Sequence, residues 1–162
     1  MTFTAIDFET ATGRPESACA VGIVTVENGI IVDEYVTLIQ PPNNEYWYGN
    51  IMCHGIKPIQ TLDKPMFDDL FPEIQKRLFG RKLVAHNERF DRNVLKKTMK
   101  YYGLYYDELE IADIWECTCK IYRAKGYKPA NLKHCADQNN IQLNHHEALS
   151  DARACAKLYL LK

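Results

Sequence analysis

The chain has 162 residues, of which 46% are apolar and 25% are charged, and its net charge is −1 at pH 7. This length and composition predict a single globular domain, residues 1–162, and exclude a disordered chain, a solenoid and a large multidomain assembly. The apolar runs are too short for a transmembrane helix, and the first residues lack the basic start of a secretory signal. We therefore expect a cytoplasmic protein with no membrane partner, whose six cysteines stay reduced.

Acidic and basic residues are distributed unevenly along the chain. Residues 1–60 hold seven acidic and two basic side chains, whereas residues 111–162 hold five acidic and eight basic ones. An acidic focus beside basic stretches is what a metal site that handles a polyanion requires, but solvated helix faces give the same counts. Charge alone therefore leaves both interpretations open.

The first third of the chain predicts three antiparallel strands. Residues 2–9 alternate between apolar and polar side chains, and two runs rich in β-branched residues follow at 18–27 and 30–39. Asn28 and Gly29 join these two runs, and both tolerate the positive φ angles of a two-residue hairpin turn. The three strands should form a meander.

The remainder alternates between helices and short strands. An aromatic, asparagine-rich segment at 43–50 leads to a helix, whose apolar residues at helical spacing are Phe67, Leu70, Ile74 and Leu78. A buried strand at 82–85 is followed by a helix, whose predicted apolar face holds Phe90, Val94, Thr98, Met99 and Tyr102. A fifth strand is expected at 109–114, and two or three helices close the chain, the last at 147–161. This order predicts an α/β protein with a mixed five-stranded sheet flanked by helices, as in the ribonuclease H-like fold.

Asp7 and Glu9 lie at the end of the first predicted strand. Because side chains two residues apart on a strand point to the same face, these carboxylates should lie side by side. Two like charges at that separation repel unless cations lie between them, and a strand otherwise filled with apolar residues would not tolerate them unpaired. The pattern is common by chance, so it indicates a metal site only together with other motifs.

Two further stretches combine histidines with acids near predicted helices. The first, residues 86–91, follows the buried fourth strand and opens a helix, where Asp91 could also be an acid favoured by the helix dipole. The second runs from His146 in a loop to Asp151 in the first turns of the last helix. The His-x4-Asp spacing of each stretch is common by itself. His86, at the end of the strand, is expected to be structural.

Together, the three stretches resemble the DnaQ-like, or DEDDh, 3′–5′ exonuclease family, relatives of the proofreading epsilon subunit of bacterial DNA polymerase III. The resemblance covers nearly the whole chain and is carried by Asp7-Phe8-Glu9-Thr10-Ala11, by Ala85 to Asp91 and by His146 to Ala152. The segment at 51–56, which ends in His54-Gly55-Ile56, is also similar to the family's stretch before its first helix. The resemblance implies five catalytic residues, which are Asp7, Glu9, Asp91, His146 and Asp151.

The resemblance also implies a mechanism that these residue types can support. The four carboxylates would hold two divalent cations, and oxygen ligands favour Mg²⁺ or Mn²⁺ over softer metals. The cations would activate a water and stabilise the departing 3′ oxygen, while His146 removes the proton of the water. His145 is the adjacent rival for this role, but the family's spacing to Asp151 selects His146.

The substrate contacts implied by the resemblance are the backbone of Thr10 and Ala11 and the side chains of His54, Asn87 and Phe90. From the residues alone, Phe90 could equally belong to the core. The aromatic residues 46–48 could stack unpaired bases, and packing onto their own domain is the alternative. The basic stretch 120–133, with Tyr122 and Tyr127, could guide a nucleic-acid backbone without sequence preference.

These inferences lead us to expect a 3′–5′ exonuclease that releases nucleoside monophosphates from single-stranded or frayed DNA 3′ ends. The alternatives are an exoribonuclease on the same scaffold and a domain that binds single-stranded nucleic acid without cutting it. Residues 75–79 resemble a peptide that binds the sliding clamp, but Leu78 falls on the apolar face of a predicted helix, so clamp binding would require unfolding. The last predicted helix is not followed by a tail that could bind a polymerase.

Overall fold

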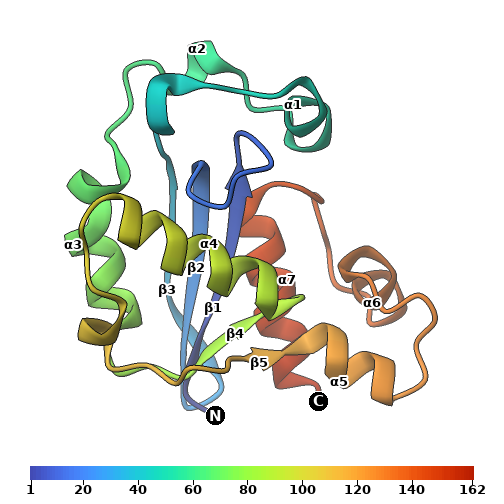
Figure 1. Ribbon diagram of the computed structural model, residues 1–162. Helices are drawn as coiled ribbons and strands as arrows, with labels where there is room; N and C mark the ends of the chain where they lie inside the picture. The colour runs from blue at the N-terminus through green and yellow to red at the C-terminus, as the bar shows by residue number, and fades with distance from the viewer.

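The computed structural model describes residues 1–162 as a mixed five-stranded sheet with helices on both faces (Figure 1). β1 (Phe3–Thr10), β2 (Ala18–Glu27) and β3 (Ile30–Leu38) form the expected antiparallel meander. β4 (Leu83–Ala85) and β5 (Glu116–Cys117) continue the sheet in parallel on the other side of β1, so the strand order is β3-β2-β1-β4-β5. The predicted fold class is confirmed.

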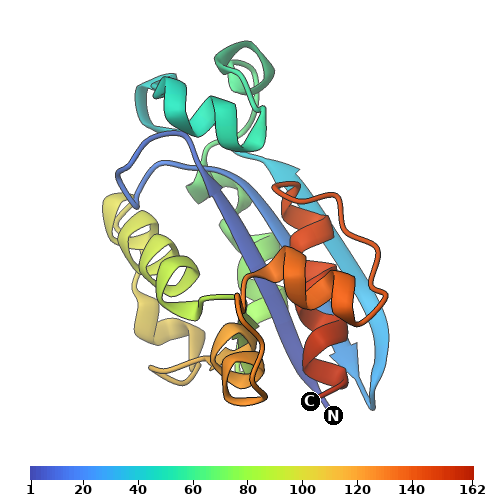
Figure 2. The ribbon, with the colours of Figure 1, turned by 90° about the vertical axis from the view of Figure 1, so that its right-hand side faces the viewer.

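Two helical layers divide the side chains of β1 between them. α3 (Phe67–Leu78) and α4 (Glu88–Tyr101) cover one face of the sheet, and α7 (Ala148–Leu160) covers the other (Figure 2). Ile6 and Phe8 pack with α3 and α4, whereas Phe3 and Ala5 pack with α7. The short helices α5 (Thr118–Ala124) and α6 (Leu132–Gln138) share a third apolar cluster with α7. Because strand side chains alternate, the row that begins with Phe3 and Ala5 continues with Asp7 and Glu9 toward α7.

Two short helices that were not predicted from the sequence lie over the end of β1, α1 (Tyr48–His54) and α2 (Pro58–Thr61) (Figure 1). A 3₁₀ turn at Pro42–Asn44 precedes them. α1 contains a glycine and Asn50, which have low helix propensity, so its own sequence gives a weak helix signal. Tertiary bonds hold it instead, because Asn50 Nδ2 donates to the carbonyl oxygens of Thr10 and Thr12 at 2.9 and 3.0 Å.

The predicted fifth strand at 109–114 is wrong. Residues Tyr106–Leu109 form a 3₁₀ turn, and the fifth strand is the two-residue β5 further along the chain. Ile114 is 71% exposed, and the carbonyl oxygen of Asp113 accepts a hydrogen bond from Arg92 of α4 at 3.0 Å. The segment is therefore a loop attached to α4, and its apolar residues do not follow the period of a strand.

The predicted buried face of α4 is correct except at Phe90. Val94, Thr98 and Met99 are buried as expected, and Tyr102, just past the end of the helix, is partly buried against the core. Phe90, however, is 44% exposed. α4 begins at Glu88, so Phe90 lies in its first turn at the edge of the core, where it lines a cavity. Phe90 is therefore available to a ligand.

The segment 75–79 that resembles a clamp-binding peptide lies at the end of α3. Leu78 is fully buried, and Arg77 is bonded to Asp33 at 2.7 Å and to Glu73 at 2.8 Å. Binding this segment as an extended peptide would therefore require α3 to unfold.

No helix of the structure combines the length and the apolar composition that crossing a bilayer would require. All six cysteines are unpaired.

Candidate active site

Three carboxylates converge where β1 ends beside the start of α7. One oxygen atom each of Asp7, Glu9 and Asp151 lies within 4.8 Å of the others. The first two acids share the face of β1 that packs on α7, and Asp151 comes from the first turn of that helix. The fold thus brings together acids that are far apart in the sequence.

Gly22 allows α7 to approach the sheet closely enough to bring Asp151 to β1. It lies opposite Asp7 in the register of β1 and β2. A Cβ atom at this position would lie 2.2 Å from the carbonyl oxygen of Ala148 and 2.5 Å from the backbone nitrogen of Leu149. These are backbone atoms of α7, so no side-chain rotation could relieve the clash. Gly22 was not predicted from the sequence, where its signal is a glycine inside a strand rich in β-branched residues.

Asp91 comes from α4 and is fixed to β1. Its Oδ1 accepts a hydrogen bond from the backbone N–H of Phe8 at 2.9 Å. β4 pairs with β1 only at Thr4 and Ala5, so no strand reaches Phe8 from that side. Buried N–H groups require a partner, and Asp91 supplies it in place of a strand. The same position lets the Asp91 charge act on Asp7, whose pKa it helps to raise.

The loop before α7 carries both candidate bases, and Asp151 holds it. Oδ2 of Asp151 accepts hydrogen bonds from the backbone N–H of His146 at 3.1 Å and from Nδ1 of His145 at 3.0 Å. His146 has a φ of 67°, in the left-handed region that few residues other than glycine adopt. The two imidazole rings stack with their centroids 3.8 Å apart. Both histidines therefore lie at the same acid.

An open cavity of about 620 Å³ lies over the acids. The predicted site residues that line it are Asp7, Glu9, Asn87, Phe90, His146 and Asp151. Asp91 lies deeper, at 1% exposure. Cys53 of α1 and His145 also line the cavity, and neither was assigned to the site from the sequence.

Three residues expected at the substrate do not line this cavity. Ala11 is fully buried, and its carbonyl oxygen accepts a hydrogen bond from the backbone N–H of Trp47 at 2.9 Å. The carbonyl oxygen of Thr10 accepts one from Nε2 of His54 at 3.1 Å. His54 instead lines a smaller cavity of about 280 Å³, formed by residues 144–148 with β2 and β3. These contacts attach α1 and the preceding segment to the end of β1.

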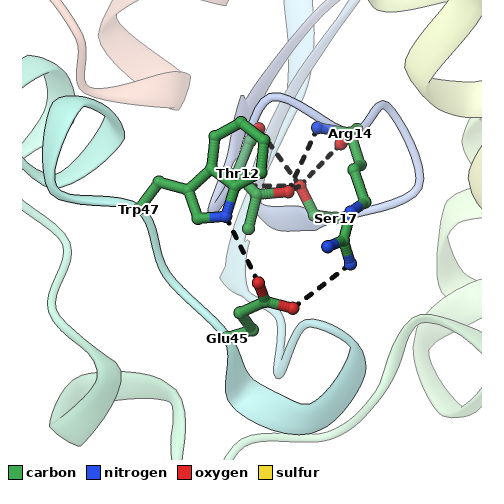
Figure 3. Close-up of polar contacts among 5 residues, drawn as sticks. All are labelled: Thr12, Arg14, Ser17, Glu45 and Trp47. Atoms are coloured by element: carbon green, nitrogen blue, oxygen red, sulfur yellow. Dashed lines mark hydrogen bonds and ion pairs between the residues drawn. The ribbon is translucent and has the colours of Figure 1, made fainter.

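Of the aromatic residues 46–48, Trp47 packs onto the loop between β1 and β2 (Figure 3), whereas the hydroxyl of Tyr46 is bonded to Thr61 at 2.9 Å. A Cβ atom on Gly13 would lie 2.6 Å from the Trp47 ring, which shows how closely the ring covers the loop. Nε1 of Trp47 donates to Glu45 at 3.2 Å, and Glu45 also pairs with Arg14 at 3.2 Å (Figure 3). Tyr48, in contrast, is 76% exposed. Trp47 therefore packs onto its own domain, whereas the side chain of Tyr48 is open to solvent.

Much of the basic stretch 120–133 is used within the fold. Tyr122 is 1% exposed, so it cannot stack on a base. Lys120 forms an ion pair at 2.8 Å with Glu88, a buried acid of α4 that the sequence analysis did not single out. Arg123 is the basic residue of this stretch that lines the cavity.

His86 is structural, as predicted. Its Nδ1 lies 2.9 Å from Oγ1 of Thr118, and its Nε2 lies 3.1 Å from the carbonyl oxygen of Ala130. Burial lowers the pKa of His86 to about 4. It therefore stays neutral near pH 7, and both ring nitrogens are already engaged.

The acids of the site are poorly solvated and repel one another. Burial raises the pKa of Glu9 to about 8, and the charges of Asp151 and Asp91 add to the effect. Burial, followed by the charges of the other three acids, raises the pKa of Asp7 well above its usual range. Burial also raises the pKa of Asp91 and of Asp151. A bound cation would reverse this field and favour the ionised carboxylates.

The donor atoms fit a hard divalent cation. Oδ1 of Asp151 is buried and has no hydrogen-bond partner, although buried oxygens normally have one. It belongs to the set formed with Asp7 and Glu9, in which every donor is a carboxylate oxygen. Mg²⁺ and Mn²⁺ prefer such ligands. A cation held by these three acids would give the unpartnered oxygen its missing contact.

The fold and this arrangement of acids define a nuclease domain, and the chain belongs to the RNase_T exonuclease family, whose model matches residues 4–159. Divalent metal ions are general to this family. The chain is 31% identical over 170 residues to the 3′–5′ exonuclease DinG of Staphylococcus aureus (strain USA300). It is 28% identical over 163 residues to the PolC-type DNA polymerase III of Caldanaerobacter subterraneus. The predicted membership of the DnaQ-like exonucleases is confirmed.

These curated relatives are much longer than the chain. The alignments cover 99% and 98% of this chain, but only 18% of DinG and 11% of the PolC-type polymerase. The similarity therefore concerns one domain of each relative.

Two solved structures have a similar fold. Exonuclease X in complex with 5′ overhanging duplex DNA matches with a TM-score of 0.73 at 25% identity, over 97% of this chain and 88% of that chain. E. coli Exonuclease I in complex with a dT13 oligonucleotide matches with a TM-score of 0.83 at 17% identity, over 99% of this chain and 40% of that chain. Both support the ribonuclease H-like architecture.

Proposed function

We propose that the protein is a 3′–5′ exonuclease that releases nucleoside monophosphates from single-stranded or frayed DNA 3′ ends by two-metal-ion hydrolysis. The observation that carries this proposal is the convergence of Asp7, Glu9 and Asp151 beside His146 in an open cavity. DinG is named a 3′–5′ exonuclease, and the structures of Exonuclease X and Exonuclease I were determined with DNA. These relatives favour DNA over RNA as the substrate.

The four carboxylates would hold two Mg²⁺ or Mn²⁺ ions. When bound, such cations lower the pKa of a water molecule and stabilise negative charge on the leaving 3′ oxygen. Asp91 uses Oδ1 to fix Phe8, so Oδ2 is the oxygen left for a cation. Asp151 uses Oδ2 to hold the histidine loop, which leaves its buried Oδ1. Each of these two acids therefore has one oxygen for the fold and one for a metal ion.

His146 would accept the proton of the attacking water at a ring nitrogen. The ring lines the cavity, and the only hydrogen bonds of its nitrogens are those to the thiol of Cys53, at 3.7 and 3.8 Å. Burial lowers the pKa of His146, which keeps the ring neutral and able to accept a proton near pH 7. His145 would instead hold Asp151 in place, because its Nδ1 is bonded to that carboxylate.

The terminal nucleotide would contact Asn87 and the exposed ring of Phe90, which both line the cavity. Arg123 would attract the phosphate backbone, and Tyr48 would stack an unpaired base. For Thr10, Ala11 and His54 we propose a positioning role, because their bonds attach α1 beside the cavity.

A direct test compares 5′-labelled DNA and RNA oligonucleotides of one sequence, single-stranded and as blunt duplexes, with Mg²⁺ or Mn²⁺. We expect stepwise shortening from the 3′ end with release of nucleoside monophosphates, faster on DNA than on RNA and faster on single strands than on blunt duplexes. Asp7→Asn is the inactive control. Faster shortening of RNA would assign the protein to the exoribonucleases, and tight binding without cleavage would leave a domain that only binds nucleic acid.

A further inference from the structure

A second set of metal-ligating groups overlaps the acid site at Asp151. Ligand atoms of His145, His146 and Asp151 lie within 4.8 Å of one another. The thiol sulfur of Cys53 lies 3.7 Å from Nδ1 and 3.8 Å from Nε2 of His146. The four groups come from three separate elements, namely α1, the loop before α7, and α7 itself.

The chemistry of this set differs from that of the acid site. The acid site offers only carboxylate oxygens, which suit Mg²⁺ and Mn²⁺. The second set offers two imidazoles and one carboxylate, and the Cys53 thiol contacts the set at His146. Together these are donors that Zn²⁺ takes in four-coordinate sites. Zn²⁺ also binds nitrogen and sulfur ligands more tightly than Mn²⁺ does. The two sets therefore select different cations, and they share Asp151.

The bonding of the individual groups also indicates an open coordination site. Oδ1 of Asp151 is buried without a hydrogen-bond partner. The ring nitrogens of His146 form no hydrogen bond other than those to the Cys53 thiol. His86, which lines the same cavity, is different, because both of its nitrogens are bonded within the fold. The second set therefore has donor atoms available for a metal ion, whereas those of His86 are already bonded.

We propose that Cys53, His145, His146 and Asp151 form an inhibitory site for Zn²⁺, in which the metal binds the histidine loop and α1 together. The cysteine loses its thiol proton when it binds the metal, and that proton is released to solvent. Occupation removes His146 as a proton acceptor and Asp151 as a ligand of the acid site. The proposed binding of Zn²⁺ does not depend on the exonuclease function, whereas the proposed inhibition rests on it.

Cobalt spectroscopy tests the binding without any measurement of activity. Co²⁺ in place of Zn²⁺ should give the near-ultraviolet thiolate-to-cobalt absorption in the wild type, and the band should disappear in Cys53→Ser. Cys119→Ser is the matched control, because Cys119 is a partly exposed cysteine that lines the same cavity beside Arg123. It should keep the band. By calorimetry, Cys53→Ser should weaken Zn²⁺ binding by at least about tenfold, since loss of even an indirect partner of a metal ligand costs that much.

Titration of Zn²⁺ into the Mg²⁺-supported cleavage assay tests the inhibition. Inhibition is expressed relative to the rate of each variant without Zn²⁺, and Cys53→Ser should require at least about tenfold more Zn²⁺ for half inhibition than the wild type or Cys119→Ser. A wild type without the cobalt band, or a Cys53→Ser variant that binds Zn²⁺ as tightly as Cys119→Ser does, would overturn the site. Failure of the proposed exonuclease function can be distinguished from failure of the Zn²⁺ site. In the first case the wild type would not cleave with Mg²⁺ alone, but it would still show the cobalt band.

Discussion

Replacing Asp7 by asparagine should stabilise the metal-free protein at neutral and alkaline pH. The Asp7 carboxylate receives no hydrogen bond that would favour its charged form, and one of its oxygens lies within 4.8 Å of oxygens of Glu9 and Asp151. The repulsion between two unit charges at such a separation is about 3 kcal/mol at an effective dielectric constant of about 20. Asparagine keeps the size of the side chain and removes the charge.

The pH dependence gives the sign and the size of the effect. Burial and the charges of Asp151 and Asp91 raise the pKa of Glu9 from 4.5 to about 8. An acid whose pKa is raised by folding binds its proton more tightly in the folded state, so its stabilising contribution is complete below about pH 4.5 and is lost as the pH rises to about 8. The loss is about 5 kcal/mol at most, because solvent in the open cavity screens the charges. The same sign holds for Asp7, because burial and the charges of Asp91, Asp151 and Glu9 raise its pKa well above the usual range. Replacing its charged carboxylate by an amide should therefore recover about 1–3 kcal/mol of repulsion at about pH 8.

Thermal unfolding with a chelator, from about pH 4.5 to about pH 8, measures this effect. At about 2–4 °C per kcal/mol for a domain of this size, Asp7→Asn should unfold roughly 2–12 °C above the wild type at about pH 8, and both should unfold together near pH 4.5. Asp63→Asn is the control, because Asp63 is 79% exposed and pairs only with Lys64, at 3.4 Å. The difference in unfolding temperature between Asp63→Asn and the wild type should not increase with pH.

A lower unfolding temperature of metal-free Asp7→Asn at about pH 8 would refute the reasoning, because Asp7 would then be a structural residue. Mg²⁺ provides an independent measurement. At a concentration about 100 times its Kd, it should stabilise the wild type by about 2.7 kcal/mol. This gain should be absent from Asp7→Asn, which lacks a ligand, and present in Asp63→Asn.

Four further outcomes are expected. His146→Ala should slow single-turnover cleavage by about 10²–10⁴-fold at saturating Mg²⁺ without weakening metal binding, whereas His145→Ala, which loses one hydrogen bond, should slow it by about tenfold at most. Gly22→Ala should lower the free energy of unfolding by about 1–3 kcal/mol or more in denaturant titrations, because its Cβ would meet the backbone of α7. Asn50→Ala should remove the hydrogen bonds of Asn50 to Thr10 and Thr12 and increase amide hydrogen exchange in α1 ahead of the rest of the domain. Exhaustive chelation should abolish cleavage, and activity that survives it would contradict the metal-ion mechanism.

Those parts of the fold that local chemistry determines were predictable from the sequence. The hairpin between β2 and β3 follows from Asn28 and Gly29, which have φ angles of 53° and 83° in the structure. The shared face of Asp7 and Glu9 follows from the strand period alone. The helix at Phe67–Leu78 follows from its apolar spacing.

The elements that were missed depend on contacts between distant segments. α1 carries little helix propensity and is held by the Asn50 side chain, which reaches the end of β1. Phe90 has the spacing of a core residue, but the helix begins too close to it for the core to cover it. A periodic pattern shows which residues can share a face, but it does not show which neighbour covers that face. Errors of this kind arise at the ends of elements, and the cavity lies there.

The fold depends on some acids of the site more than on others. For Asp91, the short length of β4 is the reason. Because β4 ends before it reaches Phe8, the backbone N–H of Phe8 is bonded to Asp91, so this acid joins α4 to β1. Asp151 likewise joins the histidine loop to α7 through Oδ2. The Asp7 carboxylate has no such bond, so it does not join elements of the fold. Two acids of the site therefore position its elements, whereas the metal-free fold would be more stable without the charge of Asp7. Under the proposed function, a bound cation would offset the repulsion between the acids that folding alone leaves in place.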